Sequence, residues 1–112
     1  MITSRNKLID LKINIGEMIK MEQEFLEIIK HYGLKNQLKK LSEEVYELQE
    51  AILLNEGGEE SYQHICEERA DVEVLLRQLD TYFELKFSDI ASWMTKKINR
   101  TKDRIADEKY IN

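Results

Sequence analysis

Apolar side chains recur at steps of three and four residues along most of the chain, and an α-helix places this spacing on one face. The pattern predicts four helical segments, over about residues 4–32, about 35–55, about 61–83 or beyond, and from about 88 onward. Gly16 interrupts the first segment at a cost of roughly 1 kcal/mol relative to alanine. That segment therefore forms one helix or two, and a short strand over residues 11–15 is the less favoured alternative.

The predicted ends of these segments carry signals typical of helix termini. Lys30, His31 and Gly33 form a helix stop, with cations in the last turn and glycine just beyond it. Gly57-Gly58 ends the second segment. Ser61 and Ser88 are placed as N-caps of the third and fourth segments. We expect residues 107–112 to fray, as chain ends commonly do.

Each helix has a predicted core face. On the second helix the stripe is Leu34, Leu38, Leu41, Val45, Leu48 and Ile52, with Gln37, Glu44, Glu47 and Ala51 in a row at its edge. On the third helix the stripe is Val72, Leu75, Leu76, Leu79 and Phe83, and Glu68 and Asp71 share its angular sector. On the fourth helix Ile90, Met94, Ile98, Thr101 and Ile105 are expected to face inward.

Composition agrees with a helical protein. The chain has 112 residues, no proline and four glycines, with 42% hydrophobic and 35% charged residues. We therefore expect an all-α fold, an antiparallel bundle of four to five helices. A chain of this length forms one domain over residues 1–112, with an N-terminal helical segment over 1–33 and the helices of the candidate site over 34–105.

Charge and cysteine content limit the possible partners. The net charge is −5 and no basic run is present, which argues against a nucleic-acid-binding surface. No run approaches the roughly 18 apolar residues of a membrane span, and the N-terminal residues lack the apolar core of a signal peptide. With Cys66 as the single cysteine, a reducing, cytoplasmic location is expected.

Two short acidic stretches carry the candidate chemistry. Glu44 and Glu47 are three residues apart on the second helix, and Glu68 and Asp71 have the same spacing on the third, so each pair shares a helix face. Carboxylates placed on a buried face need a cation, a partner or a raised pKa. Ligand sets of oxygen atoms alone favour Mg²⁺ or Mn²⁺ over zinc. The pattern predicts a magnesium site.

A basic row on the fourth helix, Lys97, Arg100 and Arg104, offers groups for the far side of a polyphosphate. With this row, the ordered acidic pair resembles the all-α nucleoside triphosphate pyrophosphohydrolase superfamily, and within it the MazG-like group. The family signature is Glu-Glu-x-x-Glu, a variable gap, then Glu-x-x-Asp. Here it is Glu43, Glu44 and Glu47, then Glu68 and Asp71. The resemblance covers about residues 34–105.

The resemblance implies an activity and roles for the residues. Such enzymes use Mg²⁺ to hydrolyse a nucleoside triphosphate to a monophosphate and pyrophosphate, and they assemble as homodimers or homotetramers. Glu44, Glu47, Glu68 and Asp71 would be the metal ligands, and Glu43 a catalytic base or a further ligand. Gln37 and the basic row would contact substrate. Many relatives have a glycine at the turn before the last helix, where this chain has Glu84-Leu85-Lys86.

Other functions remain open from the sequence. A non-catalytic helical interaction module, a degenerate relative of the family, would show no metal dependence. A related pyrophosphatase would act on dUTP, dCTP or phosphoribosyl-ATP. A di-iron carboxylate bundle ranks low, because it requires Glu-x-x-His on two helices and the chain has none.

Overall fold

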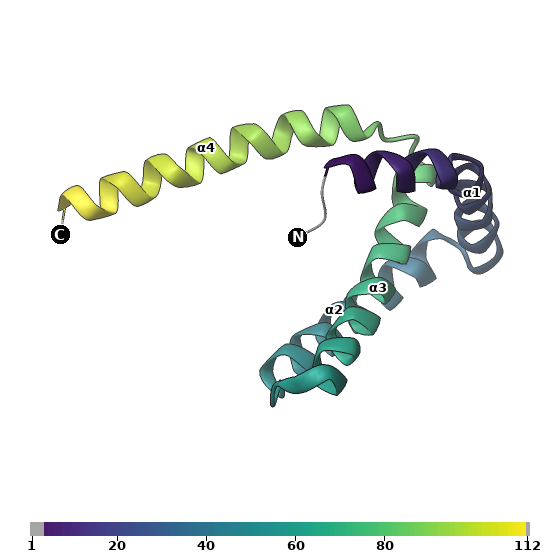
Figure 1. Cartoon of the computed structure of the whole chain (residues 1–112), viewed down its shortest axis with the longest axis horizontal. Helices are drawn as coiled ribbons and strands as arrows, with labels where there is room; N and C mark the ends of the chain where they lie inside the picture. Colours follow the sequence, from purple (N-terminus) through teal and green to yellow (C-terminus); the bar gives the residue numbers. More distant parts are fainter. Residues whose placement is uncertain (1–3, 112) are drawn as a thin grey trace.

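The computed structural model describes residues 4–111, with side chains for residues 15–109, and it contains four helices. They are α1 (Ser4–Tyr32), α2 (Leu34–Leu53), α3 (Gly58–Tyr82) and α4 (Phe87–Ile111) (Figure 1). No strand occurs among the described residues, so the all-α prediction is confirmed and the alternative of a strand over residues 11–15 is wrong. Within the same residues, no helix has the length and apolarity to cross a membrane.

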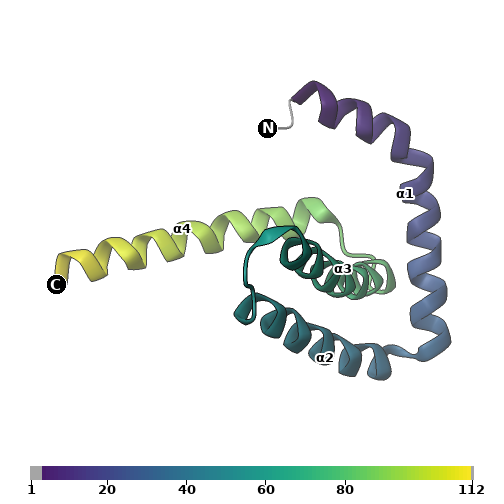
Figure 2. The same ribbon diagram turned by 60° about the horizontal axis from the view of Figure 1, so that its bottom comes forward.

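α1 runs without a break through Gly16, so the first segment is one helix rather than two. Figure 2 shows that this helix is bent along its length. It ends where Gly33, at a φ of 89°, donates its N–H to the carbonyl of Ile29 at 2.8 Å. This conformation favours glycine, and the stop predicted from Lys30, His31 and Gly33 is therefore confirmed.

Three predicted helix ends are wrong by a few residues. α3 begins at Gly58 with Gly57 at the N-cap, so Ser61 lies inside the helix. α4 begins at Phe87 instead of after Ser88. The helix also continues to Ile111 where fraying over residues 107–112 was expected, and Asn112 lies outside the described residues.

The central packing unit is the pair α2 and α3, joined by a short connection so that the helices run antiparallel (Figure 2). α1 packs on α3 and, to a smaller extent, on α2. The buried apolar residues at these contacts are Ile29, Ala51, Val72 and Leu75. Three polar residues, Gln37, Glu44 and Gln78, are buried beside them.

The buried face of α2 differs from the predicted one. Gln37, Glu44 and Ala51, placed at the edge from the sequence, are buried, whereas Leu38, Val45 and Ile52 are 44%, 36% and 53% exposed. These leucine, valine and isoleucine side chains are exposed because α2 has too few neighbouring helices to cover them. α2 packs mainly against α3, which covers one strip of its surface, and the apolar strip beside it would need a further helix to cover it.

α4 projects away from the other helices (Figure 1). Among the described residues it packs against none of α1, α2 or α3. The apolar residues of α4 that were predicted to face inward are exposed in the single chain: Met94 is 49%, Ile98 55% and Ile105 45% exposed. That prediction is therefore wrong for the single chain. The radius of gyration is 17.8 Å, against about 13 Å for a compact chain of this length.

The turn between α3 and α4 contains the one described non-glycine residue with positive φ, Glu84 at 54°. Its N–H donates to the carbonyl of Thr81 at 3.3 Å, and the N–H of Leu85 donates to the carbonyl of Asp80 at 2.8 Å. These two bonds are the Schellman pattern, in which the left-handed position is usually glycine. Glu84 therefore occupies a turn position that is usually taken by glycine.

Replacing Glu84 should test the strain at this turn. A left-handed residue with a Cβ costs about 1–2 kcal/mol, so Glu84→Gly should be more stable than Glu84→Ala, which loses the same carboxylate but keeps the Cβ. The expected difference in unfolding free energy is about 1 kcal/mol, measured by urea denaturation followed by circular dichroism. Equal stability of the two variants would show that the turn holds no strain.

Candidate metal centre

The structure brings three of the predicted carboxylates together where α2 faces α3. Glu44 comes from α2, and Glu68 and Asp71 come from successive turns of α3. One carboxylate oxygen from each lies within 4.8 Å of the other two. A Mg²⁺ ion sits about 2.1 Å from each ligand, so oxygens of one coordination shell are up to about 4.2 Å apart. Neighbouring ligands of an octahedral ion are only about 3.0 Å apart, so the three side chains would have to move closer together to bind one ion.

Two of these carboxylates have buried oxygen atoms that accept no hydrogen bond. They are Oε2 of Glu44 and Oε2 of Glu68. The side chains of Glu44 and Glu68 are 11% and 13% exposed. A buried carboxylate oxygen with no donor carries a desolvation penalty that a cation would relieve. The donor set therefore fits a hard divalent cation.

The charges around Glu44 are mostly negative. Burial raises the pKa of the Glu44 carboxyl above its ordinary value, and the neighbouring charges of Glu47 and Asp71 raise it further. Lys40 opposes this shift, with its Nζ 3.5 Å from Oε1 of Glu44. The Lys40 side chain is 55% exposed, so solvent screens its charge and it compensates the cluster only in part.

His64 lies beside Glu68 on α3, as Lys40 lies beside Glu44 on α2. Its Nδ1 lies 4.0 Å from Oε1 of Glu68, one helical turn further along. A second cationic group would thus stand beside the cluster when this imidazole is protonated. The imidazole is more than half exposed, so it lies at the rim of the cluster and not within it.

A hollow opens on each side of the three carboxylates. One, of about 330 Å³, is lined by Glu68 and His64 of α3 and by Glu47 of α2. The other, of about 360 Å³, is lined by Glu44, Asp71 and Gln37, with Tyr32 at the end of α1. Glu47 is thus beside Glu68, although it is not one of the three residues whose oxygens converge. A ligand could reach the carboxylates from either side.

Gln37 is held by a second buried amide. Its Nε2 donates to Oε1 of Gln78 at 2.8 Å, across the contact between α2 and α3. Both side chains are buried, and both line the hollow that contains Glu44 and Asp71. The bond fixes the register of α2 against α3 beside the carboxylates, since a buried amide left without a partner would cost about 1–3 kcal/mol.

The remaining predicted site residues lie apart from this cluster. Glu43 is exposed on α2 and contributes no oxygen to the cluster. Lys97, Arg100 and Arg104 are exposed on α4, which packs on none of the helices that carry the carboxylates. Two burial predictions also change: Glu44 is buried and not at an edge, and Asp71 is exposed and not on the buried side. Asp71 lies at the border of α3's buried strip, next to Val72.

Three residues near the cluster were missed from the sequence. Lys40 and His64 each precede a cluster carboxylate by four residues, the spacing of helical ion pairs. Gln78 follows Asp71 by seven residues and interrupts the apolar run around Leu75 and Leu79. A polar residue within an apolar stripe is a sequence signal for a buried hydrogen bond. Its partner Gln37 was already among the predicted site residues.

Comparisons of the chain with protein-family models, with curated proteins and with solved structures give no match.

The raised pKa of Glu44 predicts a pH dependence of stability in metal-free protein. The folded state holds the Glu44 proton more tightly than the unfolded state does, so this group stabilises the fold below its ordinary pKa of about 4.5. That stability is lost as the pH rises through the higher pKa of the folded state.

Glu44→Gln mimics the protonated carboxyl and should remove this loss. In chelator, the variant should therefore melt at a higher temperature than the wild-type protein at pH 7, and the difference should shrink as the pH falls toward 4.5. Glu43→Gln, at the exposed neighbouring position, is the matched control and should melt like the wild type. A variant at Glu44 that is less stable than the wild type at pH 7 would contradict the charge balance described here.

Proposed function

We propose that the chain is a Mg²⁺-dependent nucleoside triphosphate pyrophosphohydrolase, which releases a nucleoside monophosphate and pyrophosphate. The observation that carries this proposal is the convergence of Glu44, Glu68 and Asp71 with two buried, unpartnered carboxylate oxygens. The resemblance of Glu43, Glu44, Glu47, Glu68 and Asp71 to the MazG-like signature supplies the reaction class. Mn²⁺ would suit the same oxygen ligands.

In this reaction the oxygen of a water molecule bonds to the α- or the β-phosphorus, and the bond from that phosphorus to the oxygen bridging the two breaks. The bridging oxygen leaves with the other product, and a base accepts the proton of the water. A bound Mg²⁺ would neutralise the phosphate charge and lower the pKa of the attacking water. Glu44, Glu68 and Asp71 would hold the ion, and Glu47 would be a further ligand from the neighbouring hollow.

Two roles rest on the resemblance. Glu43 is proposed as the base or as a further ligand on the resemblance alone, since it is exposed on α2 and contributes no oxygen to the cluster. Gln37 is proposed to contact substrate, since it lines the hollow that contains Glu44 and Asp71.

Lys97, Arg100 and Arg104 are proposed to bind phosphate groups. α4 does not pack on the helices that carry the carboxylates of its own chain. These residues would therefore have to reach the carboxylates of another copy of the chain. A homodimer or homotetramer is therefore part of the proposal. It would also supply the helix bundle that the sequence predicts, and the exposed apolar residues of α4 support it.

A second candidate function is a non-catalytic helical interaction module. The projecting α4, with exposed apolar residues and no packing against α1, α2 or α3, favours this alternative. The two functions differ in their need for metal. An interaction module would bind its partner equally well in chelator and would release no pyrophosphate from any nucleotide.

Glu68→Gln tests the enzymatic proposal. The wild-type protein, given a panel of canonical and modified nucleoside triphosphates, should release pyrophosphate in Mg²⁺ and none in chelator. The variant keeps the shape of the side chain but removes its charge. Turnover should fall by at least about 100-fold, because changing a residue that only supports a metal ligand already costs about 10–100-fold.

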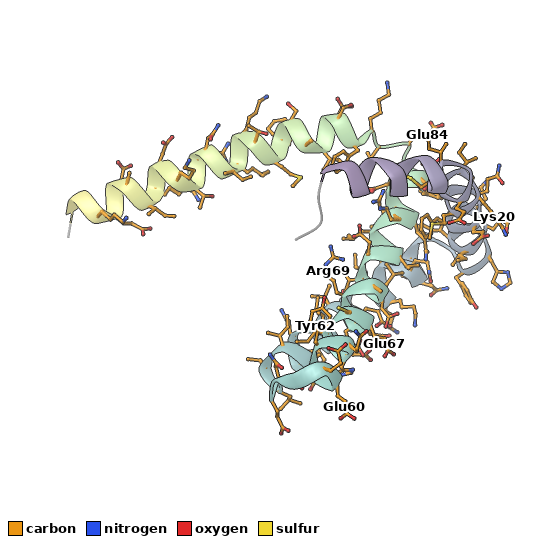
Figure 3. The ribbon with its side chains drawn as sticks, in the orientation of Figure 1. Lys20, Glu60, Tyr62, Glu67, Arg69 and Glu84 are labelled. Carbon is orange, nitrogen blue, oxygen red and sulfur yellow. The ribbon has the colours of Figure 1, made fainter. Side chains whose placement is uncertain are left out.

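Glu67→Gln is the matched control, because Glu67 is the exposed neighbour on α3 (Figure 3). It should keep nearly full activity, and circular dichroism should show equal helix content in both variants. No pyrophosphate release by the wild-type protein across the panel would refute the enzymatic proposal. Equal activity of Glu68→Gln and Glu67→Gln would refute the role of the cluster.

A further inference from the structure

One of the two hollows at the carboxylates has ends of different chemistry. This hollow, of about 360 Å³, has Glu44 and Asp71 at one end and the amides of Gln37 and Gln78 at the other. Gln37 precedes Glu44 by seven residues on α2, and Gln78 follows Asp71 by seven residues on α3. Since the two helices are antiparallel (Figure 2), both amides lie about two helical turns, roughly 10 Å, from the carboxylates in the same direction. We call this space the amide hollow.

The two amides have hydrogen-bonding groups that they do not use. Nε2 of Gln37 donates to Oε1 of Gln78 at 2.8 Å, whereas Oε1 of Gln37 and Nε2 of Gln78 have no hydrogen-bond partner among the described residues. Neither atom is a fully buried one, so each keeps some surface, although the two residues are only 6% and 2% exposed. That surface opens into the amide hollow, which both residues line. One acceptor and one donor therefore face the hollow next to each other.

The walls of the amide hollow are apolar. They include Ile28 of α1 and Val74 and Leu75 of α3. Tyr32, the last residue of α1, also lines the hollow, and it is 57% exposed, so its ring lies at the mouth. The volume is within the range of about 300–1,000 Å³ that is usual for pockets holding small organic ligands. Apolar walls with an aromatic ring at the mouth suit a flat heteroaromatic ring, which packs through its faces.

A nucleotide has ends of the same two kinds. Its phosphates bind a metal ion, which suits the carboxylate end of the hollow, and its base is a flat ring with hydrogen-bond donors and acceptors along the edge. Lys40 also lines the hollow, with its Nζ 3.5 Å from Oε1 of Glu44, so a cation stands at the carboxylate end. A donor and an acceptor in a pocket with apolar walls are the groups that recognise the edge of a base.

We propose that the amide hollow binds the base of the nucleotide, and that Gln37 and Gln78 together bond to a donor and a neighbouring acceptor on the edge of that base. The proposal rests on the proposed function for the kind of ligand. Rotating both amide groups by 180° keeps the bond between them and exchanges the free donor with the free acceptor. Each canonical base has a donor beside an acceptor on its Watson–Crick edge. The pair therefore selects for an intact base edge, and not for one canonical base over another.

The test compares three ligands, in Mg²⁺, that the proposed reaction does not consume. Uridine 5′-monophosphate has an intact edge, N3-methyluridine 5′-monophosphate lacks the edge donor, and ribose 5-phosphate lacks the base. In calorimetry, uridine monophosphate should bind at least about tenfold more tightly than either other ligand, because a blocked or missing edge leaves the amides without partners. In nuclear magnetic resonance spectra, uridine monophosphate should shift the side-chain amide signals of Gln37 and Gln78, whereas ribose 5-phosphate should leave them in place.

A double variant tests the amide pair itself. In Gln37→Met/Gln78→Met, both partners of the buried hydrogen bond become apolar side chains of similar length, so neither amide is left unpaired and the fold should persist. Uridine monophosphate and N3-methyluridine monophosphate should then bind with nearly equal affinity. Gln49→Met/Gln63→Met is the matched control, since these glutamines are exposed, one on α2 and one on α3, and it should keep the preference for the intact edge.

The proposal would be overturned by any of five results. They are no binding of the three ligands; equal binding of uridine monophosphate and either other ligand; unmoved amide signals of Gln37 and Gln78 when uridine monophosphate binds; a folded double variant that keeps the preference; and a control variant that loses it. If the double variant loses helix content by circular dichroism, the comparison of ligands on the wild-type protein decides alone.

Failure of the enzymatic proposal would look different. Edge-dependent binding without pyrophosphate release from any triphosphate would refute catalysis and leave the amide hollow as a base-binding site. Pyrophosphate release at equal rates from uridine and N3-methyluridine triphosphates would refute the role of Gln37 and Gln78 and leave catalysis in place.

Discussion

The arrangement of α2 and α3 depends on how the protein accommodates three carboxylates at the contact between them. Two carboxylate oxygens, from Glu44 and Glu68, are buried there without a hydrogen-bond donor. In the absence of a cation, the contact that holds the two helices together also contains repulsion between like charges of Glu44 and Asp71. A divalent cation bound by the same carboxylates would remove their repulsion and connect the two helices. For this reason we propose that the function resides at this contact.

Other polar side chains lie beside the carboxylates at the contact between α2 and α3. Lys40 and His64 approach the outer oxygens of Glu44 and Glu68, one from each helix. The amide bond between Gln37 and Gln78 fixes the helix register beside the carboxylates. A metal-binding site needs ligands held at set positions, and here the pairing of two helices supplies that constraint without a loop or a disulfide.

The sequence predicted the helices well, and three of its candidate carboxylates lie together in the structure, since both depend on local spacing. Helical periodicity located all four helices, and the three-residue spacing of Glu68 and Asp71 placed them on neighbouring turns of α3. The faces of the helices were harder to predict, because burial depends on which neighbours are present. Gln37 and Glu44 are buried, although leucines stand beside them in the sequence, because α3 packs on their strip of α2.

α4 shows the same limit. Its apolar stripe was predicted to face inward, but Met94, Ile98 and Ile105 are exposed in the single chain, because periodicity carries no information about whether a neighbouring helix covers the stripe. The left-handed conformation of Glu84 came only from the structure, because glutamate gives no local signal for it.

The central claim is that Glu44, Glu68 and Asp71 bind a divalent cation together. The most direct measurement is calorimetric titration of Mg²⁺ and of Mn²⁺ into metal-free protein, in parallel with Asp71→Asn and with Glu73→Gln, a carboxylate of the same helix outside the cluster. Binding should be saturable, should weaken at least about tenfold in Asp71→Asn and should be unchanged in Glu73→Gln. Absence of binding to the wild-type protein, or equal binding to both variants, would contradict it.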